Sequence, residues 1–157
     1  MDNVKFTHIE AGKARMVDIS EKPDVTRRAR AAGEILLSRP TIEKIREGEV
    51  EKGNVLATAR VAAVMAVKRT PDSIPLCHQI PITGIDVDFE LGEDTISAFV
   101  EVRSVGKTGV EMEALSGVSA ALLTVWDMVK SAEKDASGNY PHTAIRDIRV
   151  LEKVKGY

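Results

Sequence analysis

An α+β domain, with helices on one face of an antiparallel sheet, is the fold that this sequence predicts. The first observation is residues 85–91, which alternate strictly between apolar and acidic side chains, as a half-buried strand does. The second is the tight turn at 92–94, after which residues 96–102 resume the alternation and complete a hairpin. The third is the order of the elements: helices before the hairpin, a long helix after it and a final strand. This order fits a ferredoxin-like βαββαβ core with extra N-terminal helices, in one domain of residues 1–157.

The N-terminal half of the chain is predicted to be mostly helical. Residues 15–19 are a short candidate strand, and residues 25–37 are rich in helix formers and predict a helix. Pro40 suits the first turn of a second, short helix. Asn54 can cap a third helix over residues 55–69. That helix is apolar on most sides, so we expect it to be buried or to lie between subunits.

The C-terminal half is predicted to hold a long helix over residues 109–134 and a closing strand over residues 145–154. Successive side chains of a strand point to opposite faces of the sheet. We therefore expect Lys153 on the face opposite Val150 and Val154.

Composition limits the classes of function. The chain has 157 residues, of which 43% are hydrophobic and 29% charged, as in a soluble globular domain. No apolar run approaches the roughly 18–20 residues that span a bilayer, and residues 1–16 lack the apolar centre of a signal peptide. A single cysteine fits a reducing cytoplasm. The net charge of −2 argues against a general nucleic-acid binder. We expect a cytoplasmic protein with no nucleic-acid or membrane partner, and a small anionic ligand stays possible.

Residues 106–115, Gly-Lys-Thr-Gly-Val-Glu-Met-Glu-Ala-Leu, lie where a strand is predicted to end and the long helix to begin. The first N–H groups of a helix lack intrahelical partners, so this junction can hold an anion. The segment is similar to a P-loop, but that motif requires a glycine where this chain has Glu101. A glutamate there would repel phosphate. A P-loop nucleoside triphosphatase, such as a kinase or GTPase, is therefore disfavoured.

Glu111 has two interpretations. Thr108 and Glu111 match the capping-box spacing, and spacing alone favours that structural role over ligand binding. The cap does not account for Met112 or Glu113. Neighbouring helical residues point in different directions, so Glu113 must face elsewhere.

Asp127 and Lys130 are spaced i, i+3 and share one face of the same helix. Spacing alone favours a surface ion pair of little energetic value. The alternative is an acid–base pair in which the carboxylate orients or tunes the lysine.

Leu76, Cys77 and His78 lie in a predicted loop that Pro75 and Pro81 stiffen. The chain has too few cysteine and histidine residues for a convincing metal site, and adjacent side chains rarely form a nucleophile pair. Two interpretations stay open for His78: presentation to a ligand, or a packed structural role.

Taken together, six segments resemble the MoaC family, the cyclic pyranopterin monophosphate synthases of molybdenum cofactor biosynthesis. The resemblance covers nearly the whole chain. The segments that carry it are 11–12, 16–20, 52–60, 75–78, 106–115 and 126–130.

The resemblance implies an enzyme that acts on 3',8-cyclo-7,8-dihydroguanosine 5'-triphosphate. The product is cyclic pyranopterin monophosphate, with release of pyrophosphate. The family has a ferredoxin-like fold and assembles as a homohexamer, a trimer of dimers, with active sites at the dimer interface. No cofactor or metal is implied. The non-enzymatic alternative is a ferredoxin-like ligand-binding module.

The resemblance also assigns roles to ten residues. Asp127 corresponds to the active-site aspartate, Lys130 to its acid–base partner, and Lys153 to a further catalytic lysine. The substrate-binding residues that it implies are Leu76, Cys77, His78, Glu111, Met112, Glu113 and Lys52. The chain departs from the family pattern at Gln79, which replaces a proline, and in the residues that flank Lys153.

Overall fold

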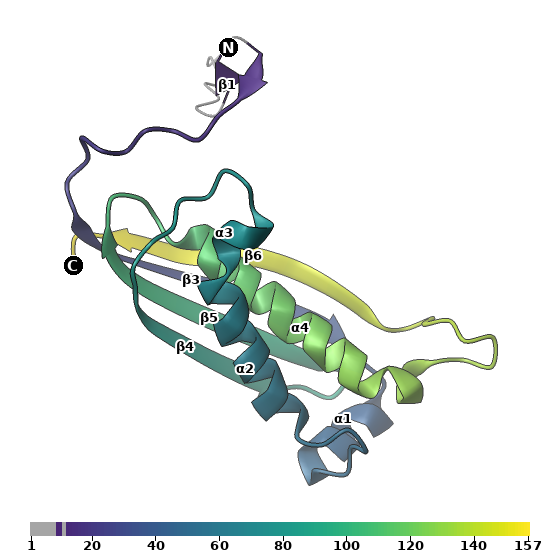
Figure 1. Ribbon diagram of the computed structural model, residues 1–157. Helices are drawn as coiled ribbons and strands as arrows, with labels where there is room; N and C mark the ends of the chain where they lie inside the picture. The colour runs from purple at the N-terminus through teal and green to yellow at the C-terminus, as the bar shows by residue number, and fades with distance from the viewer. Residues whose placement is uncertain (1–8, 11) are drawn as a thin grey trace, which may run out of the picture.

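The computed structural model describes residues 9–10 and 12–157 (Figure 1). Two expectations from the sequence concern residues outside the described ones. They are the place of Ala11 in the first family-like segment and the expectation of no signal peptide over most of residues 1–16. In chain order the elements are β1 (Ile9–Glu10), β2 (Lys13–Ala14), β3 (Val25–Leu36), α1 (Arg39–Glu47), α2 (Val55–Lys68), α3 (Thr70–Ser73), β4 (Ile82–Leu91), β5 (Thr95–Gly106), α4 (Glu111–Glu133) and β6 (Ala144–Lys155).

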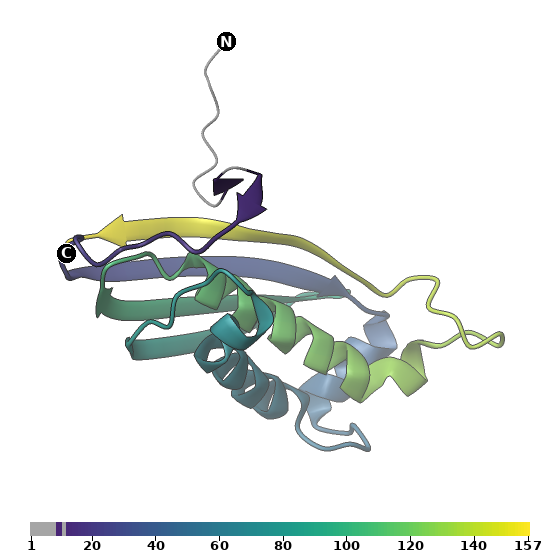
Figure 2. The ribbon, with the colours of Figure 1, turned by 45° about the horizontal axis from the view of Figure 1, so that its top comes forward.

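The main sheet is antiparallel, with the strand order β4-β5-β3-β6. Both long helices, α2 and α4, lie side by side on one face of it, and the other face is left open (Figures 1 and 2). The succession β3, α2, β4, β5, α4, β6 is the predicted ferredoxin-like βαββαβ core, with α1 and α3 as additional helices before the hairpin. The predicted fold class is confirmed.

A core of small and branched aliphatic side chains joins the sheet to the helices. Small and branched aliphatic side chains can pack densely, so this core needs almost no aromatic residues. Its fully buried members include Ile35, Ile96, Val100, Val102, Val118, Leu122 and Val125.

The segment predicted as a helix over residues 25–37 is instead the strand β3, so that prediction is wrong. Ala29, Ala31 and Ile35 are fully buried under the helices, and Arg30 is exposed on the open face. As a central strand, β3 pairs with β5 on one side and β6 on the other. These long-range partners override the helix propensity of its alanine and arginine residues.

The strand β6 pairs with β3 through a bulge at Leu151, where the pairing shifts between Arg30 and Ala31. One extra residue reverses the face to which the following side chains point. Val150 and Lys153 therefore face the same side, toward the helix layer, and they line one pocket. The expectation that Lys153 lies opposite Val150 is wrong.

Two further predictions at element ends are wrong. Residues 15–19 form no strand, and the short pairing lies just before them, at β2. The start of α4 is not a capping box, because the N-cap residue is Val110 and no side chain caps the helix. Thr108 therefore precedes the cap, and Glu111 is free for another partner.

The predicted starts of α1 and α2 are confirmed. Pro40 lies in the first turn of α1, and Gly48 ends this helix with a left-handed backbone (φ 75°). The Asn54 side chain caps α2 by accepting a hydrogen bond from the Ala57 N–H at 2.9 Å.

Candidate active site

The ten residues singled out in the sequence gather in two places on the chain. Seven line one pocket of about 470 Å³ between the 74–81 loop, the start of α4 and β6. These seven are Leu76, Cys77, His78, Glu111, Met112, Glu113 and Lys153. The other three, Lys52, Asp127 and Lys130, form a cluster near the far end of α4.

Lys153 and Glu111 form the ion pair that closes one side of the pocket, with 2.5 Å between Lys153 Nζ and Glu111 Oε1. Burial alone would raise the pKa of Glu111, but the hydrogen bond and charge of Lys153 lower that pKa below its usual value. Gly109 leaves room for this carboxylate, since a Cβ at Gly109 would overlap it. Glu111 is therefore an anion at neutral pH.

Glu113 is in the opposite state, although one residue separates it from Glu111. Its side chain is buried, at 2% exposure. Burial raises the pKa of Glu113, and the Glu111 charge raises it further. Burial likewise raises the pKa of the Cys77 thiol, with a contribution from Glu113. The pocket thus pairs a carboxylate with a carboxyl group that holds a proton more tightly, the arrangement that divides acid and base roles.

His78 and Lys107 both bind the extended segment that precedes β3. The Nε2 atom of His78 lies 2.7 Å from the Val17 carbonyl oxygen. A carbonyl only accepts, so Nε2 carries a proton and donates it to this oxygen. Lys107 Nζ donates to the Ser20 carbonyl oxygen at 2.6 Å. The P-loop-like lysine therefore has a structural partner in this segment.

The second group is centred on Asp127. Lys130 Nζ donates to Asp127 Oδ1 at 2.8 Å, while Lys52 Nζ lies 3.3 Å from Oδ2 and donates to the Asp127 carbonyl oxygen at 2.8 Å. The hydrogen bond from Lys130, followed by that from Lys52, lowers the pKa of Asp127. The Asp127 hydrogen bond in turn raises the pKa of Lys130. The cluster therefore carries two ammonium groups and one carboxylate.

The two groups do not meet within one chain. Glu111 and Asp127 are separated by sixteen residues of continuous helix, which at about 1.5 Å per residue is roughly 24 Å. One small substrate cannot touch both groups on the same chain.

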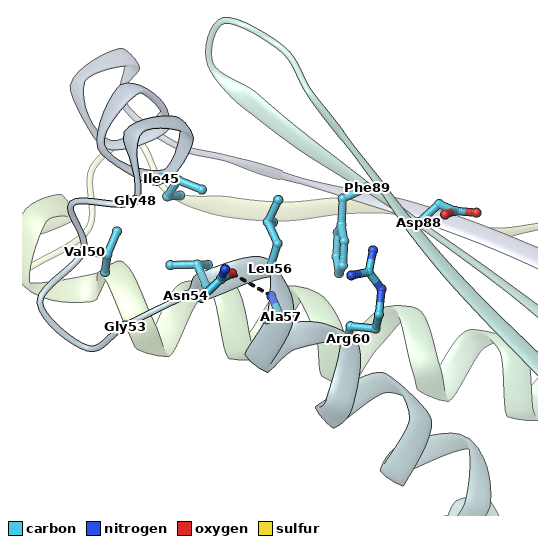
Figure 3. Close-up of a pocket in the computed structure, with 11 residues that line it drawn as sticks. Ile45, Gly48, Val50, Gly53, Asn54, Leu56, Ala57, Arg60, Asp88 and Phe89 are labelled. Carbon is cyan, nitrogen blue, oxygen red and sulfur yellow. Dashed lines mark hydrogen bonds between the residues drawn. The ribbon is translucent and has the colours of Figure 1, made fainter.

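A third location, at the start of α2, is a pocket of about 470 Å³ without any of the ten residues (Figure 3). Two of its polar side chains, Asn54 and Arg60, already have partners within the chain. The Asn54 side chain caps α2, and Arg60 Nε donates to the Val87 carbonyl oxygen while its guanidinium lies over the Phe89 ring. We interpret these contacts as packing of α2 against β4.

Among residues 9–10 and 12–157, no three His, Cys, Asp or Glu side chains are grouped in a way that could hold a metal ion. By length and composition alone, α4 could span a membrane. Half of its apolar stretch is buried inside the domain, and packing on the sheet accounts for that character.

Several residues of these sites were not predicted from the sequence. Ile80, Thr108, Gly109 and Val150 complete the pocket lining. Gly109 had a readable signal, since a glycine two residues before a carboxylate at a helix start provides space for it. No sequence signal identified Val150, because the bulge decides to which face of the sheet its side chain points.

Comparison with known proteins gives close relatives. Residues 16–156 match the sequence profile of the MoaC family. The chain is 81% identical over 151 residues to a probable cyclic pyranopterin monophosphate synthase of Methanosarcina mazei and 79% identical over 151 residues to that of Methanosarcina acetivorans, with 96% of each chain covered. It is also 58% identical over 153 residues to the probable synthase of Pyrococcus abyssi, which covers 98% of this chain and 96% of the relative.

Proposed function

Because the chain belongs to the MoaC family, we propose that it converts 3',8-cyclo-7,8-dihydroguanosine 5'-triphosphate to cyclic pyranopterin monophosphate and pyrophosphate. The observation that carries the site assignment is the division of ten family-like residues into two groups at opposite ends of α4. Each group by itself lacks what the reaction needs. The pocket has two glutamates and one lysine, and the Asp127 cluster has two lysines on one carboxylate.

A second copy of the chain would bring the two groups together. Met112, Ser116, Ser119, Leu123, Asp127 and Lys130 recur every three or four residues and form one stripe along α4. Leu123, near its middle, is 60% exposed. If two α4 helices pack antiparallel about a twofold axis, Ser119 meets Leu123 and Met112 meets Lys130. The pocket of one chain then faces the Asp127 cluster of its partner.

Exposed apolar side chains on α2 extend this surface. Val61 and Met65 lie one turn apart and are 59% and 45% exposed. Contiguous apolar surface of this kind usually marks an interface. We infer a dimer through α2 and α4, three of which form the hexamer implied by the family.

The chemistry divides between the two groups. Opening a purine-derived ring and closing a pterin requires proton transfers, and Glu113, Glu111 and Lys130 are the groups that we assign to them. Closing the cyclic phosphate forms a bond from a substrate hydroxyl to the innermost phosphorus and breaks that phosphorus's bond to the departing pyrophosphate. Lys52, Lys130 and Lys153 would stabilise the charge on that leaving group. A cytoplasmic location fits such a substrate.

The test supplies the purified protein with the cyclised intermediate and measures pyrophosphate and an oxidisable pterin. We expect both from the wild type. We expect the folded Lys130→Ala variant to lose turnover by about two to four orders of magnitude, the range for an acid–base group. Lys44→Ala, an exposed lysine on α1, is the matched control. Normal activity of Lys130→Ala would refute the role of Lys130.

A further inference from the structure

Tyr140, on the loop between α4 and β6, packs on the same side of α4 as Lys130. Trp126 and Lys130 are four residues apart on α4, so their side chains follow one another along one face of the helix, and Lys134 is the first residue after it. The Tyr140 ring meets the Trp126 ring edge-on, with centroids 5.4 Å apart and planes at 74°. Lys134 Nζ lies 5.9 Å from the centre of the same ring. The Tyr140 ring therefore contacts Trp126 and Lys134, and Tyr140 is close enough to Lys130 to interact with it electrostatically.

The loop holds Tyr140 in place from both sides. Before it, Asp135 Oδ1 accepts hydrogen bonds from the backbone N–H groups of Ser137 at 2.8 Å and Asn139 at 3.0 Å. After it, Thr143 Oγ1 donates to Glu133 at 2.8 Å, a bond buried at the end of α4. Tyr140 is half-buried, unlike the exposed residues around it.

Lys130 needs such support. Lys130 Nζ donates to Asp127 Oδ1, and the two side chains are 43% and 61% exposed. Exposed pairs of this kind are weakly held, because two flexible side chains must keep one geometry in water. Lys52 also competes for the same carboxylate. A rigid aromatic wall beside the lysine stem reduces the rotamers that carry the ammonium away from Asp127.

We propose that Tyr140 is a positioning residue for Lys130, with its ring packed along the lysine stem so that the ammonium stays on Asp127. The proposal rests on the function proposed above, in which Lys130 reacts. The charged groups near Lys130 are Asp127 on α4, Lys134 just after α4, and Lys52 from the loop before α2. Asp127 raises the pKa of Lys130, and Tyr140 contributes less in the same direction.

The experiment compares wild type, Tyr140→Ala and Tyr140→Phe. In Tyr140→Ala we expect kcat to fall about tenfold with little change in KM, as for a misplaced reacting group. Tyr140→Phe keeps the ring and should restore kcat. Tyr157→Ala, which removes the chain's other tyrosine, is the control.

Two readouts do not require turnover. Trp126 is the only tryptophan, so its emission reports directly on the contact with Tyr140 and should shift in Tyr140→Ala. Acylation of Lys130, followed by mass spectrometry, should become several-fold faster, because a lysine freed from Asp127 has a lower pKa and more neutral amine. Tyr140→Leu serves if Tyr140→Ala does not fold.

Wild-type kcat and wild-type Lys130 acylation in Tyr140→Ala would overturn the proposal, and so would unchanged Trp126 emission. If the wild type itself makes no pterin, the proposed function fails, and the acylation rates still decide whether Tyr140 positions Lys130.

Discussion

At the scale of single residues, the pKa values of Glu111 and Glu113 shift in opposite directions because their surroundings differ. Lys153 holds Glu111 as an anion, whereas Glu113 is buried and has Glu111 as a neighbour. A buried carboxyl group costs stability when it must ionise. Such a cost at an active site is the usual trade between stability and reactivity.

Glu113→Gln should therefore stabilise the protein and abolish its activity. The folded pKa of Glu113 is raised, so the native state binds more protons than the unfolded state between the two pKa values. Stability from this group is complete at low pH and is lost as the pH rises through the folded pKa. Thermal unfolding at pH 7 should show a gain of about 0.5–2 kcal/mol that vanishes below about pH 4. A destabilised Glu113→Gln variant at pH 7 would contradict the buried, proton-holding state.

At the scale of elements, the sequence predicts those that carry their own local signal. The β4–β5 hairpin is confirmed because its alternation is strict and its turn is short, and α2 is confirmed because Asn54 caps it. The strand β3 has no such local signal. Its alanines and glycine are small because other elements pack closely against the strand. A Cβ at Gly33 would lie 2.9 Å from both Val118 on α4 and Ile148 on β6.

In the candidate site, too, local features could be predicted from the sequence and long-range contacts could not. The site residues could be predicted from motifs in the sequence. Their predicted roles in binding and catalysis do not depend on the fold. Their grouping could not be read, because the meeting of Lys52 with Asp127 joins segments 75 residues apart. The bulge at Leu151 places Lys153 beside Glu111, and no periodic pattern in the sequence predicts this bulge.

Glu133 joins three elements and gives a prediction at this scale. Its carboxylate, at the end of α4, accepts hydrogen bonds from the Ser38 N–H and hydroxyl before α1 and from the Thr41 and Thr143 hydroxyls. Burial alone would raise its pKa, but these donors lower it on balance. Its contribution is present above the unfolded pKa and is lost as the pH falls through the lower folded pKa.

Glu133→Gln should lower the free energy of unfolding at pH 7 by about 1–3 kcal/mol, the cost of disturbing buried hydrogen bonds to a charge. The difference should shrink below about pH 4, where glutamate itself becomes protonated. Glu93→Gln, which removes an exposed ion pair with Arg39, is the control and should change little. If chemical denaturation shows equal changes in the free energy of unfolding for the two substitutions, the proposed role of Glu133 is wrong.

At the scale of the whole molecule, the exposed stripe on α4 and the division of the site point to one assembly. In a monomer, Leu123 is solvent-exposed and a charge there is harmless. In the proposed dimer it is buried at the twofold axis, where an unpaired charge is costly.

Leu123→Glu should therefore give a folded monomer without synthase activity, although no reacting group has changed. Sedimentation or light scattering would measure the mass, and circular dichroism the fold. Val105→Glu, at an apolar side chain 45% exposed on the open sheet face, is the matched control and should keep the α2–α4 dimer. An active monomer would rule out a shared site.

The most direct test mixes two inactive chains. His78→Ala damages the pocket, and Lys130→Ala damages the Asp127 cluster. If each site takes its pocket from one chain and its cluster from the other, a mixed dimer has one intact site. Co-expression in equal amounts should then restore about a quarter of wild-type pterin formation, since half of random dimers are mixed and half of their sites are intact. No recovered activity in dimers shown to contain both chains would contradict the division of the site between two subunits.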